Sequence, residues 1–230
     1  MKAGVPEHKI IQFCNLDELQ YFDEDVVPKH VKGRREVFID GGSLNLYSSD
    51  QFMQWCGYEC DKIIAFESDH RSVRICEEIL QRTPKLGKVT ELVTRGLWSN
   101  ETELAFTEVD NYGSSSFVLH KGGYGKKQVI PTTSIDIVLN GEPVTFIKMD
   151  IEGSELEALK GAQNTIMKYH PTLAISIYHK SEDIVELPGF IKSLEPNYNL
   201  YLRNYHLDNT ETVLYAIYRD TKNIEEGTDI

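Results

Sequence analysis

The stretch FIKMDIEGSELEALKGA, residues 146–162, decides the fold, because a buried strand and an amphipathic helix meet within it. The apolar run over residues 144–149 predicts a strand, which ends abruptly at two carboxylates, Asp150 and Glu152. A helical pattern over residues 152–167 follows. In open α/β sheets, ligands bind beyond the carboxyl ends of the strands, so both carboxylates are predicted to lie at a ligand site. On the simplest alternative, Glu152 only favours the start of the helix electrostatically.

The charge balance and the shortness of the apolar runs argue against several classes of partner. The 230 residues include 24 basic and 36 acidic side chains, a formal charge of -12, which argues against nucleic acid or an anionic membrane as the main partner. No apolar run approaches the ~18 residues of a membrane span, and the first residues carry no secretory pattern. The cysteines have no zinc-ligand spacing and are interpreted as free thiols, so we expect a cytoplasmic protein.

Strand patterns alternate with helical patterns along most of the chain. The expected strands cover residues 37–39, 63–66, 89–93, 144–149, 173–177, 200–203 and 212–218. The expected helices cover residues 47–55, 71–80, 152–167 and 182–194, with a helical turn over 134–139. This alternation predicts an α/β fold with a mostly parallel, doubly wound sheet. The last two strands are joined without a helix, so one of them is expected to run antiparallel.

Three further segments complete the predicted organisation. Residues 1–35, with a short helix over 16–22, are interpreted as an N-terminal arm packed on a domain of residues 36–219. Between residues 97 and 131, strand patterns over 104–107 and 117–120 flank a loop rich in glycine and serine. They predict a β-hairpin-like insertion. Residues 220–230 form a polar tail.

Two neighbouring strands end in residues typical of a nucleotide site. The segment VFIDGGSLNLY places Gly41 and Gly42 after a strand, where glycine lets the backbone approach a ligand and a helix start can hold an anion. Glu67 follows the next strand, ~20–25 residues later, where an acid can bind ribose hydroxyls. Alternatively, the glycines form only a tight turn and Glu67 lies beside a helix cap at Ser68 or Asp69. Together they favour an adenosine-containing cofactor. The turn lacks the glycine spacing of a nicotinamide dehydrogenase.

The chain resembles the FkbM family of S-adenosylmethionine-dependent methyltransferases. The resemblance covers roughly Tyr21 to Tyr218, and the DIEG and YHK-x-x-D segments make it specific. The matching segments are VFIDGG, IIAFESD, GLWSNETELAF, FIKMDIEGSELEALKGA, PTLAISIYHKSEDIVELP, YNLYLRNY and ETVLYAIY. The resemblance implies a Rossmann-like class I methyltransferase fold, S-adenosylmethionine as cofactor, and O-methylation of a sugar, glycan or secondary-metabolite hydroxyl.

The resemblance also implies roles for individual residues. The implied cofactor site comprises Asp40, Gly41, Gly42, Ser43, Glu67, Ser68, Trp98 and Asp150. The implied catalytic residues are Asp150, Glu152 and His179. The chain departs from the family at Leu46, where a glycine is usual, and at Ser68, where proline is frequent. The Leu46 side chain either crowds the carboxylate end of the cofactor or points back into the core.

Methyl transfer to an alcohol is helped by a general base, and His179 is our first choice because imidazole titrates near neutral pH. Asp150 or Glu152 is the alternative base or orients the acceptor. Alternatively, His179 is only a surface residue beside Lys180. His206 is a weaker candidate for the general base. A metal bound by Asp150, Glu152 and His179 is a minority hypothesis, since no spacing motif supports it, and we predict no metal. A non-catalytic cofactor-binding module and an accessory domain of a larger glycan-assembly enzyme remain as alternative functions.

Overall fold

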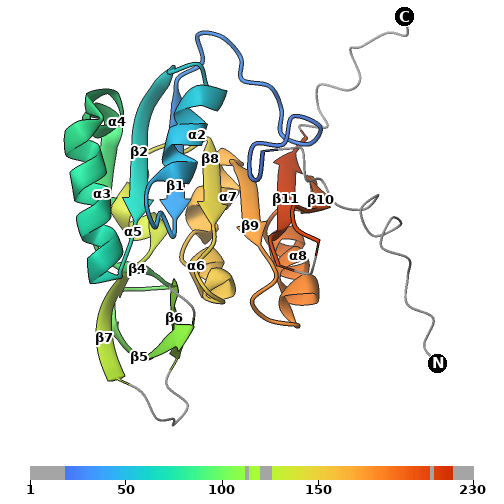
Figure 1. Ribbon diagram of the computed structural model, residues 1–230. Coiled ribbons are helices and arrows are strands. Elements are labelled where there is room, and N and C mark those ends of the chain that lie inside the picture. The colour runs from blue at the N-terminus through green and yellow to red at the C-terminus, as the bar shows by residue number, and fades with distance from the viewer. Residues whose placement is uncertain (1–18, 112–113, 120–125, 208–209, 220–230) are drawn as a thin grey trace, which may run out of the picture.

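A seven-stranded sheet in the order β10-β11-β9-β8-β1-β2-β3 runs through the protein (Figure 1). The computed structural model describes residues 19–111, 114–119, 126–207 and 210–219. The strands of this sheet are β1 (Glu36–Gly41), β2 (Cys60–Phe66), β3 (Thr90–Val93), β8 (Phe146–Met149), β9 (Thr172–Ser176), β10 (Tyr198–Asn204) and β11 (Thr212–Tyr218). Only β11 runs antiparallel to its neighbours, β9 and β10; the other strand pairs are parallel. The predicted mostly parallel sheet with an antiparallel last strand is therefore confirmed.

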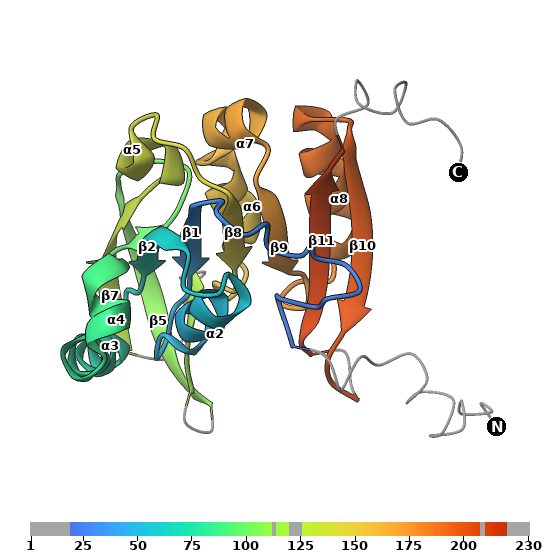
Figure 2. The same cartoon turned by 90° about the horizontal axis from the view of Figure 1, so that it is seen from above.

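Helices cover both faces of this sheet, because neighbouring residues of the central strands point to opposite sides. Phe38 and Ile63 pack into one apolar cluster, whereas Ile39 and Ile64 pack into the other. Figure 2 shows one group of helices on each side. The first group is α2 (Tyr47–Trp55), α3 (His70–Arg82) and α4 (Pro84–Val89). The second group is α5 (Ile135–Leu139), α6 (Glu155–Lys160), α7 (Gln163–Tyr169) and α8 (Asp183–Leu194).

The single helix expected over residues 152–167 is wrong in two respects. It begins later, at Glu155, because Glu152 and Gly153 have φ values of 54° and 87°, which a right-handed helix cannot contain. It is also divided into α6 and α7, and Asp136 of α5 accounts for the break. The backbone N–H of Asp136 donates to the carbonyl of Gly161 at 2.9 Å, and its carboxylate accepts the N–H of Thr165 at 2.9 Å. Helix α5 thus supplies hydrogen-bond partners both to the C-terminal end of α6 and to the N-terminal end of α7.

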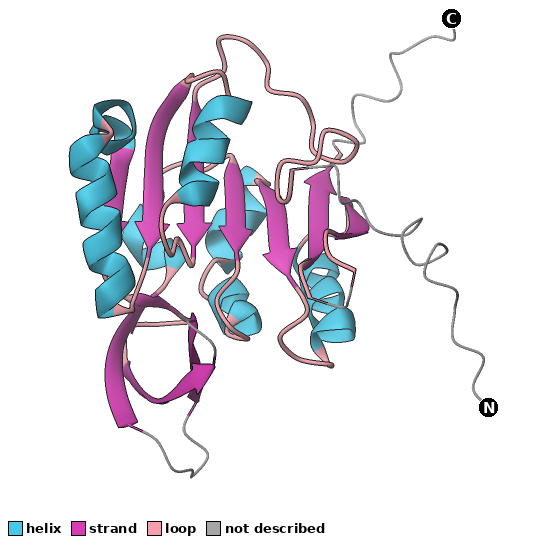
Figure 3. Ribbon diagram, in the orientation of Figure 1, coloured by secondary structure: helices cyan, strands magenta, loops and turns pink. Residues whose placement is uncertain are grey.

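A second, four-stranded sheet in the order β4-β7-β5-β6 lies beyond the carboxyl ends of β1 and β2 (Figure 3). Its strands are β4 (Gly96–Leu97), β5 (Glu103–Asn111), β6 (Ser114–Leu119) and β7 (Lys126–Thr133). Strand β5 pairs antiparallel with both β6 and β7. The predicted β-hairpin-like insertion is confirmed, with longer strands than the sequence indicated. We did not predict helix α4.

The segment before β1 packs against the sheet over residues 19–35. Phe22 is buried, and its ring centroid lies 5.3 Å from that of Phe146 in β8 and 6.1 Å from that of Phe38 in β1. Residues 19–22 form a turn rather than the expected helix, and the rest of that expected helix, residues 16–18, lies outside the described residues. The domain boundaries remain a prediction. No helix within the described part of the chain is long and apolar enough to cross a membrane.

Candidate active site

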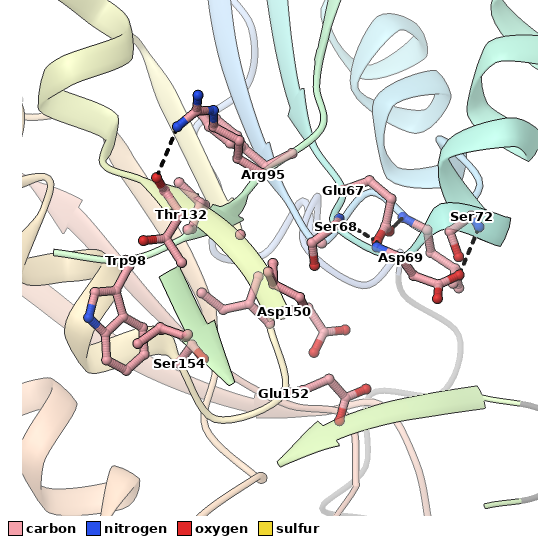
Figure 4. Close-up of a pocket in the computed structure, with 18 of the residues that line it drawn as sticks. Glu67, Ser68, Asp69, Ser72, Arg95, Trp98, Thr132, Asp150, Glu152 and Ser154 are labelled. Atoms are coloured by element: carbon pink, nitrogen blue, oxygen red, sulfur yellow. Dashed lines mark hydrogen bonds between the residues drawn. The ribbon is translucent and has the colours of Figure 1, made fainter. Parts of the chain in front are cut away.

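A cavity of about 440 Å³ opens at the carboxyl ends of the central strands, where ligands of open α/β sheets bind (Figure 4). One side of it is lined by the loops that follow three neighbouring strands of the large sheet, with Gly42 after β1, Glu67 after β2 and Asp150 after β8. The second sheet supplies apolar lining through Leu104 of β5 and Ile130 of β7. The cavity therefore lies between the two sheets.

The turn after β1 is held from behind by two buried charges. Asp40 accepts hydrogen bonds from the hydroxyls of Ser48 and Ser49, each at 2.7 Å, and so fixes the start of α2. Lys148 lies 3.2 Å from Asp40 and donates to the carbonyl oxygen of Gly42 at 2.8 Å. Neither Asp40 nor Lys148 lines the cavity. They shape the turn.

Gly42 lines the cavity in a backbone conformation that other residues rarely adopt. Its φ is 76°, and a Cβ there would lie 2.0 Å from the carbonyl oxygen of Asp150. Gly41 and Ser43 lie behind the turn: the Ser43 hydroxyl is buried and donates to the carbonyl oxygen of Phe66 at 3.3 Å. The close approach of the Gly42 and Asp150 backbones thus requires glycine.

Leu46 points into the core. Its side chain is 1% exposed and packs in the apolar cluster on the α2 side of the sheet, away from the cavity lining. Its backbone has a φ of 60°, the left-handed conformation that favours glycine. The exposed Leu44 lines the cavity instead.

Glu67 joins the loops that follow β1 and β2. One carboxylate oxygen accepts the N–H of Leu44 at 2.9 Å, and the other accepts those of Ser68 and Asp69, each at 2.8 Å. Burial raises the pKa of Glu67, although these backbone donors oppose the rise. A carboxylate has about four acceptor positions, so Glu67 retains capacity for a ligand hydroxyl. Asp69, rather than Ser68, caps α3 by accepting from two backbone N–H groups.

Two tyrosine hydroxyls hold the carboxylate of Asp150. Tyr21 donates to Oδ2 at 2.9 Å and Tyr178 donates to Oδ1 at 3.1 Å. Burial, followed by the charge of Asp150, raises the pKa of both phenols, so they remain donors at neutral pH. Tyr21 comes from the segment before β1, which explains why no local pattern in the sequence associated it with Asp150.

His179 lies behind the cavity lining among three carboxylates. Its Nε2 atom lies 3.5 Å from Asp150 Oδ1 and 3.7 Å from Glu152 Oε2, and its Nδ1 atom lies 3.0 Å from Glu155 Oε1. Burial disfavours the charged imidazolium, but the three carboxylates outweigh it and raise the pKa of His179. The side chain is 9% exposed, so His179 is not a surface residue.

Glu152 differs from Asp150 in its surroundings. It lines the cavity, its side chain is 47% exposed, and its φ of 54° marks a locally strained backbone. Burial raises the pKa of Glu152, whereas the nearby His179 lowers it. Glu152 is therefore the more accessible of the two carboxylates beside Nε2.

The structure separates the predicted residues into two groups. Those that line the cavity are Gly42, Glu67, Ser68, Trp98, Asp150 and Glu152. Those that lie behind the lining are Asp40, Gly41, Ser43 and His179. His206 is exposed in the loop after β10 and lies outside the lining. Sequence reasoning identified Asp69 only as a helix cap and missed Tyr21, Arg95, Thr132 and Glu155; of these four, only Glu155 had a usable signal, its place within DIEGSE.

The order of the seven-stranded sheet and the cavity at the carboxyl ends of its strands are those of a Rossmann-like class I methyltransferase fold. A family model described as "Methyltransferase FkbM domain" matches residues 40–211, and the chain belongs to this family. S-adenosylmethionine, the cofactor implied by the resemblance, agrees with this membership. No curated protein sequence matches the chain.

Solved methyltransferase structures are similar to the chain in fold. Methyltransferase FkbM from Methylobacillus flagellatus is 25% identical, with a TM-score of 0.73 over 91% of this chain and 50% of that one. The present chain thus spans half the length of that protein. An rRNA methylase from Streptococcus thermophilus is 14% identical, with a TM-score of 0.51 over 80% of this chain and 87% of that one. The METTL16 methyltransferase domain is 13% identical, with a TM-score of 0.52 over 83% and 63%. These last two share only the fold.

Proposed function

We propose that this protein uses S-adenosylmethionine to methylate a hydroxyl group of a sugar, glycan or secondary metabolite. One observation carries the proposal: a single cavity joins Glu67 and the glycine turn to Asp150 and Glu152, with His179 behind them. When bound, the cofactor supplies an electrophilic methyl group. The residues present fit it, because the Gly42 backbone lines the cavity and Glu67 offers a carboxylate for ribose hydroxyls.

The residues proposed to bind the cofactor lie toward one end of the cavity. Glu67 holds the ribose, and the turn at Gly42 faces the methionine part. Trp98 lies across the cavity from Glu67 in Figure 4 and is suited to cover the adenine side. The apolar lining from the second sheet helps to exclude water, which favours displacement at the methyl group.

At the other end, the chain must orient a hydroxyl and accept its proton. Both oxygens of Asp150 already accept tyrosine hydroxyls, so Asp150 is better suited to orientation than to proton transfer. Glu152 is exposed to the cavity and can accept a hydrogen bond from the acceptor. We assign His179 Nε2 as the general base, since it lies 3.5 Å from Asp150 and 3.7 Å from Glu152, which line the cavity. Aligning the acceptor oxygen at near-attack distance is the main contribution expected of the protein.

The direct test is turnover with a panel of sugars, oligosaccharides and hydroxylated metabolites. Formation of S-adenosylhomocysteine, together with a product heavier by one methyl group, would support the proposal. His179→Ala is expected to lose most turnover while it retains cofactor binding. His170→Ala is the matched control, because His170 ends α7 outside the cavity lining. Unchanged turnover in His179→Ala would remove His179 as the base.

A Leu46 side chain that crowded the cofactor site would favour the non-catalytic module, but Leu46 is buried in the core. We therefore favour the enzyme over the binding module.

A further inference from the structure

A buried carboxylate that the proposed mechanism leaves unused contacts the proposed base. Glu155, in the first turn of α6, is fully buried. Its Oε1 atom accepts the backbone N–H of Ile151 at 2.9 Å, which fixes the carboxylate relative to the strand end. The same oxygen lies 3.0 Å from Nδ1 of His179. Glu155 thus contacts Nδ1 of His179, whereas Asp150 and Glu152 lie nearest to Nε2.

Both residues of this contact contain a buried atom without an aligned hydrogen bond. Among the described residues, four buried side-chain atoms lack a hydrogen-bond partner, and two of them are Glu155 Oε2 and His179 Nδ1. Such atoms are unfavourable unless they are satisfied. A proton on Nδ1 that is directed at Glu155 Oε1, 3.0 Å away, would give Nδ1 a partner.

The imidazole is also fixed by its other neighbours. The Tyr178 ring packs against it, with centroids 4.2 Å apart. Asp150 and Glu152 face Nε2, and Asp183 is a further carboxylate whose charge acts on the same group. Among the described residues, Glu155 alone has a carboxylate oxygen within hydrogen-bond distance of Nδ1, at 3.0 Å.

We propose that Glu155 is the positioning residue for His179, holding the tautomer that carries its proton on Nδ1 and leaves Nε2 free to accept one. The inference rests on the proposed methyl transfer. As the acceptor hydroxyl loses its proton, that proton joins Nε2, and the Glu155 carboxylate stabilises the resulting imidazolium. Carboxylate–imidazole pairs orient the base in this way in other enzymes.

Glu155→Gln tests the proposal because it keeps the size of the side chain and removes its charge. We expect kcat to fall about 100-fold or more, with cofactor affinity unchanged. Loss of the carboxylate lowers the pKa of His179, so the acid limb of the kcat profile should move to lower pH. Glu155→Asp should restore part of the activity. Glu157→Gln, the same change on the same helix at a part-exposed position, should leave rate and profile unchanged.

A measurement independent of turnover separates this inference from the proposed function. In nitrogen-15 NMR spectra of the wild type, the His179 imidazole should be protonated on Nδ1 when neutral, and Glu155→Gln should mix the tautomers and lower its titration midpoint. An unmoved midpoint would overturn the proposal, even in an active enzyme. If no acceptor is methylated but the tautomer is fixed as expected, only the proposed function fails.

Metal titration of the chelator-treated protein supplies a second overturning outcome. One ligand atom each from Asp150, Glu155 and His179 lies within 4.8 Å of the others, which is a spacing compatible with a bound ion. Micromolar Mn²⁺ binding that is lost in both Glu155→Gln and His179→Ala would make the trio a metal site. No such binding is the result that the positioning role predicts.

Discussion

The ammonium group of Lys148 lies 3.2 Å from the carboxylate of Asp40, and both side chains are buried. The two residues are register partners in the β1–β8 pair. Lys148 also donates to the carbonyl oxygens of Gly41 and Gly42, at 3.0 and 2.8 Å. The segments VFIDGG and FIKMD are thereby joined, and the shape of the glycine turn depends on a charge supplied by the neighbouring strand.

Lys148→Met should therefore strongly destabilise the fold. Removing one partner leaves Asp40 charged and buried, which typically costs about 3–5 kcal/mol. Lys62→Met is the matched control: Lys62 pairs with Glu91 at 2.9 Å on the part-exposed surface, where about 1 kcal/mol or less is expected. Urea unfolding measures both. Equal losses in the two variants would contradict the role assigned to Lys148.

Gly42→Ala should be worse than Gly141→Ala, although both residues have a positive φ, 76° and 84°. At Gly141 the new methyl group meets nothing within 4 Å, so only backbone strain of about 1–2 kcal/mol is added. At Gly42 it would also lie 2.0 Å from the Asp150 carbonyl, so about 1–3 kcal/mol more is expected. Thermal and urea unfolding give the comparison, and equal stability of the variants would show that the turn tolerates a side chain.

Leu46 combines a favourable side chain with an unfavourable backbone, and two substitutions separate these contributions. Leu46→Ala loses core packing and keeps the positive φ, so a loss of about 2–5 kcal/mol is expected. Leu46→Gly loses the same packing but relieves the strain, and it should be more stable than Leu46→Ala by about 1 kcal/mol. The reverse order in urea unfolding would contradict the left-handed backbone at this position.

His30 makes stability depend on pH. Hydrogen bonds to Glu59 at 2.9 Å and to Glu36 at 3.0 Å raise its pKa, despite partial burial. A raised pKa stabilises the fold below the unfolded value of about 6.5, and this contribution is lost as pH rises through the folded value. The stability difference between wild type and His30→Gln should therefore be larger at about pH 5.5 than at about pH 8.5. A difference that grows with pH would have the wrong sign.

Patterns within single elements could be predicted from the sequence. The helix over 47–55 and the strand over 212–218 have the predicted bounds, because apolar spacing and turn residues define them locally. The division of α6 from α7 could not be predicted, since Asp136 comes from another helix. The antiparallel direction of β11 followed from the short connection before it.

Local motifs likewise identified much of the cavity lining but little of its support. Strand patterns identified three residues of the lining, Gly42, Glu67 and Asp150, because each directly follows a strand. Tyr21 reaches Asp150 only because the segment before β1 packs across the sheet. The orientation of Leu46 depended on its backbone φ, which its spacing in the sequence does not determine.

The central claim is that this cavity binds S-adenosylmethionine through Glu67. Calorimetric titration with S-adenosylmethionine and S-adenosylhomocysteine, with NAD as a control, tests it on the wild type and on Glu67→Ala. We predict micromolar binding of both sulfur compounds by the wild type, loss of that binding in Glu67→Ala, and no binding of NAD. A folded wild-type protein that binds neither sulfur compound, or a Glu67→Ala variant with unchanged affinity, would contradict the account.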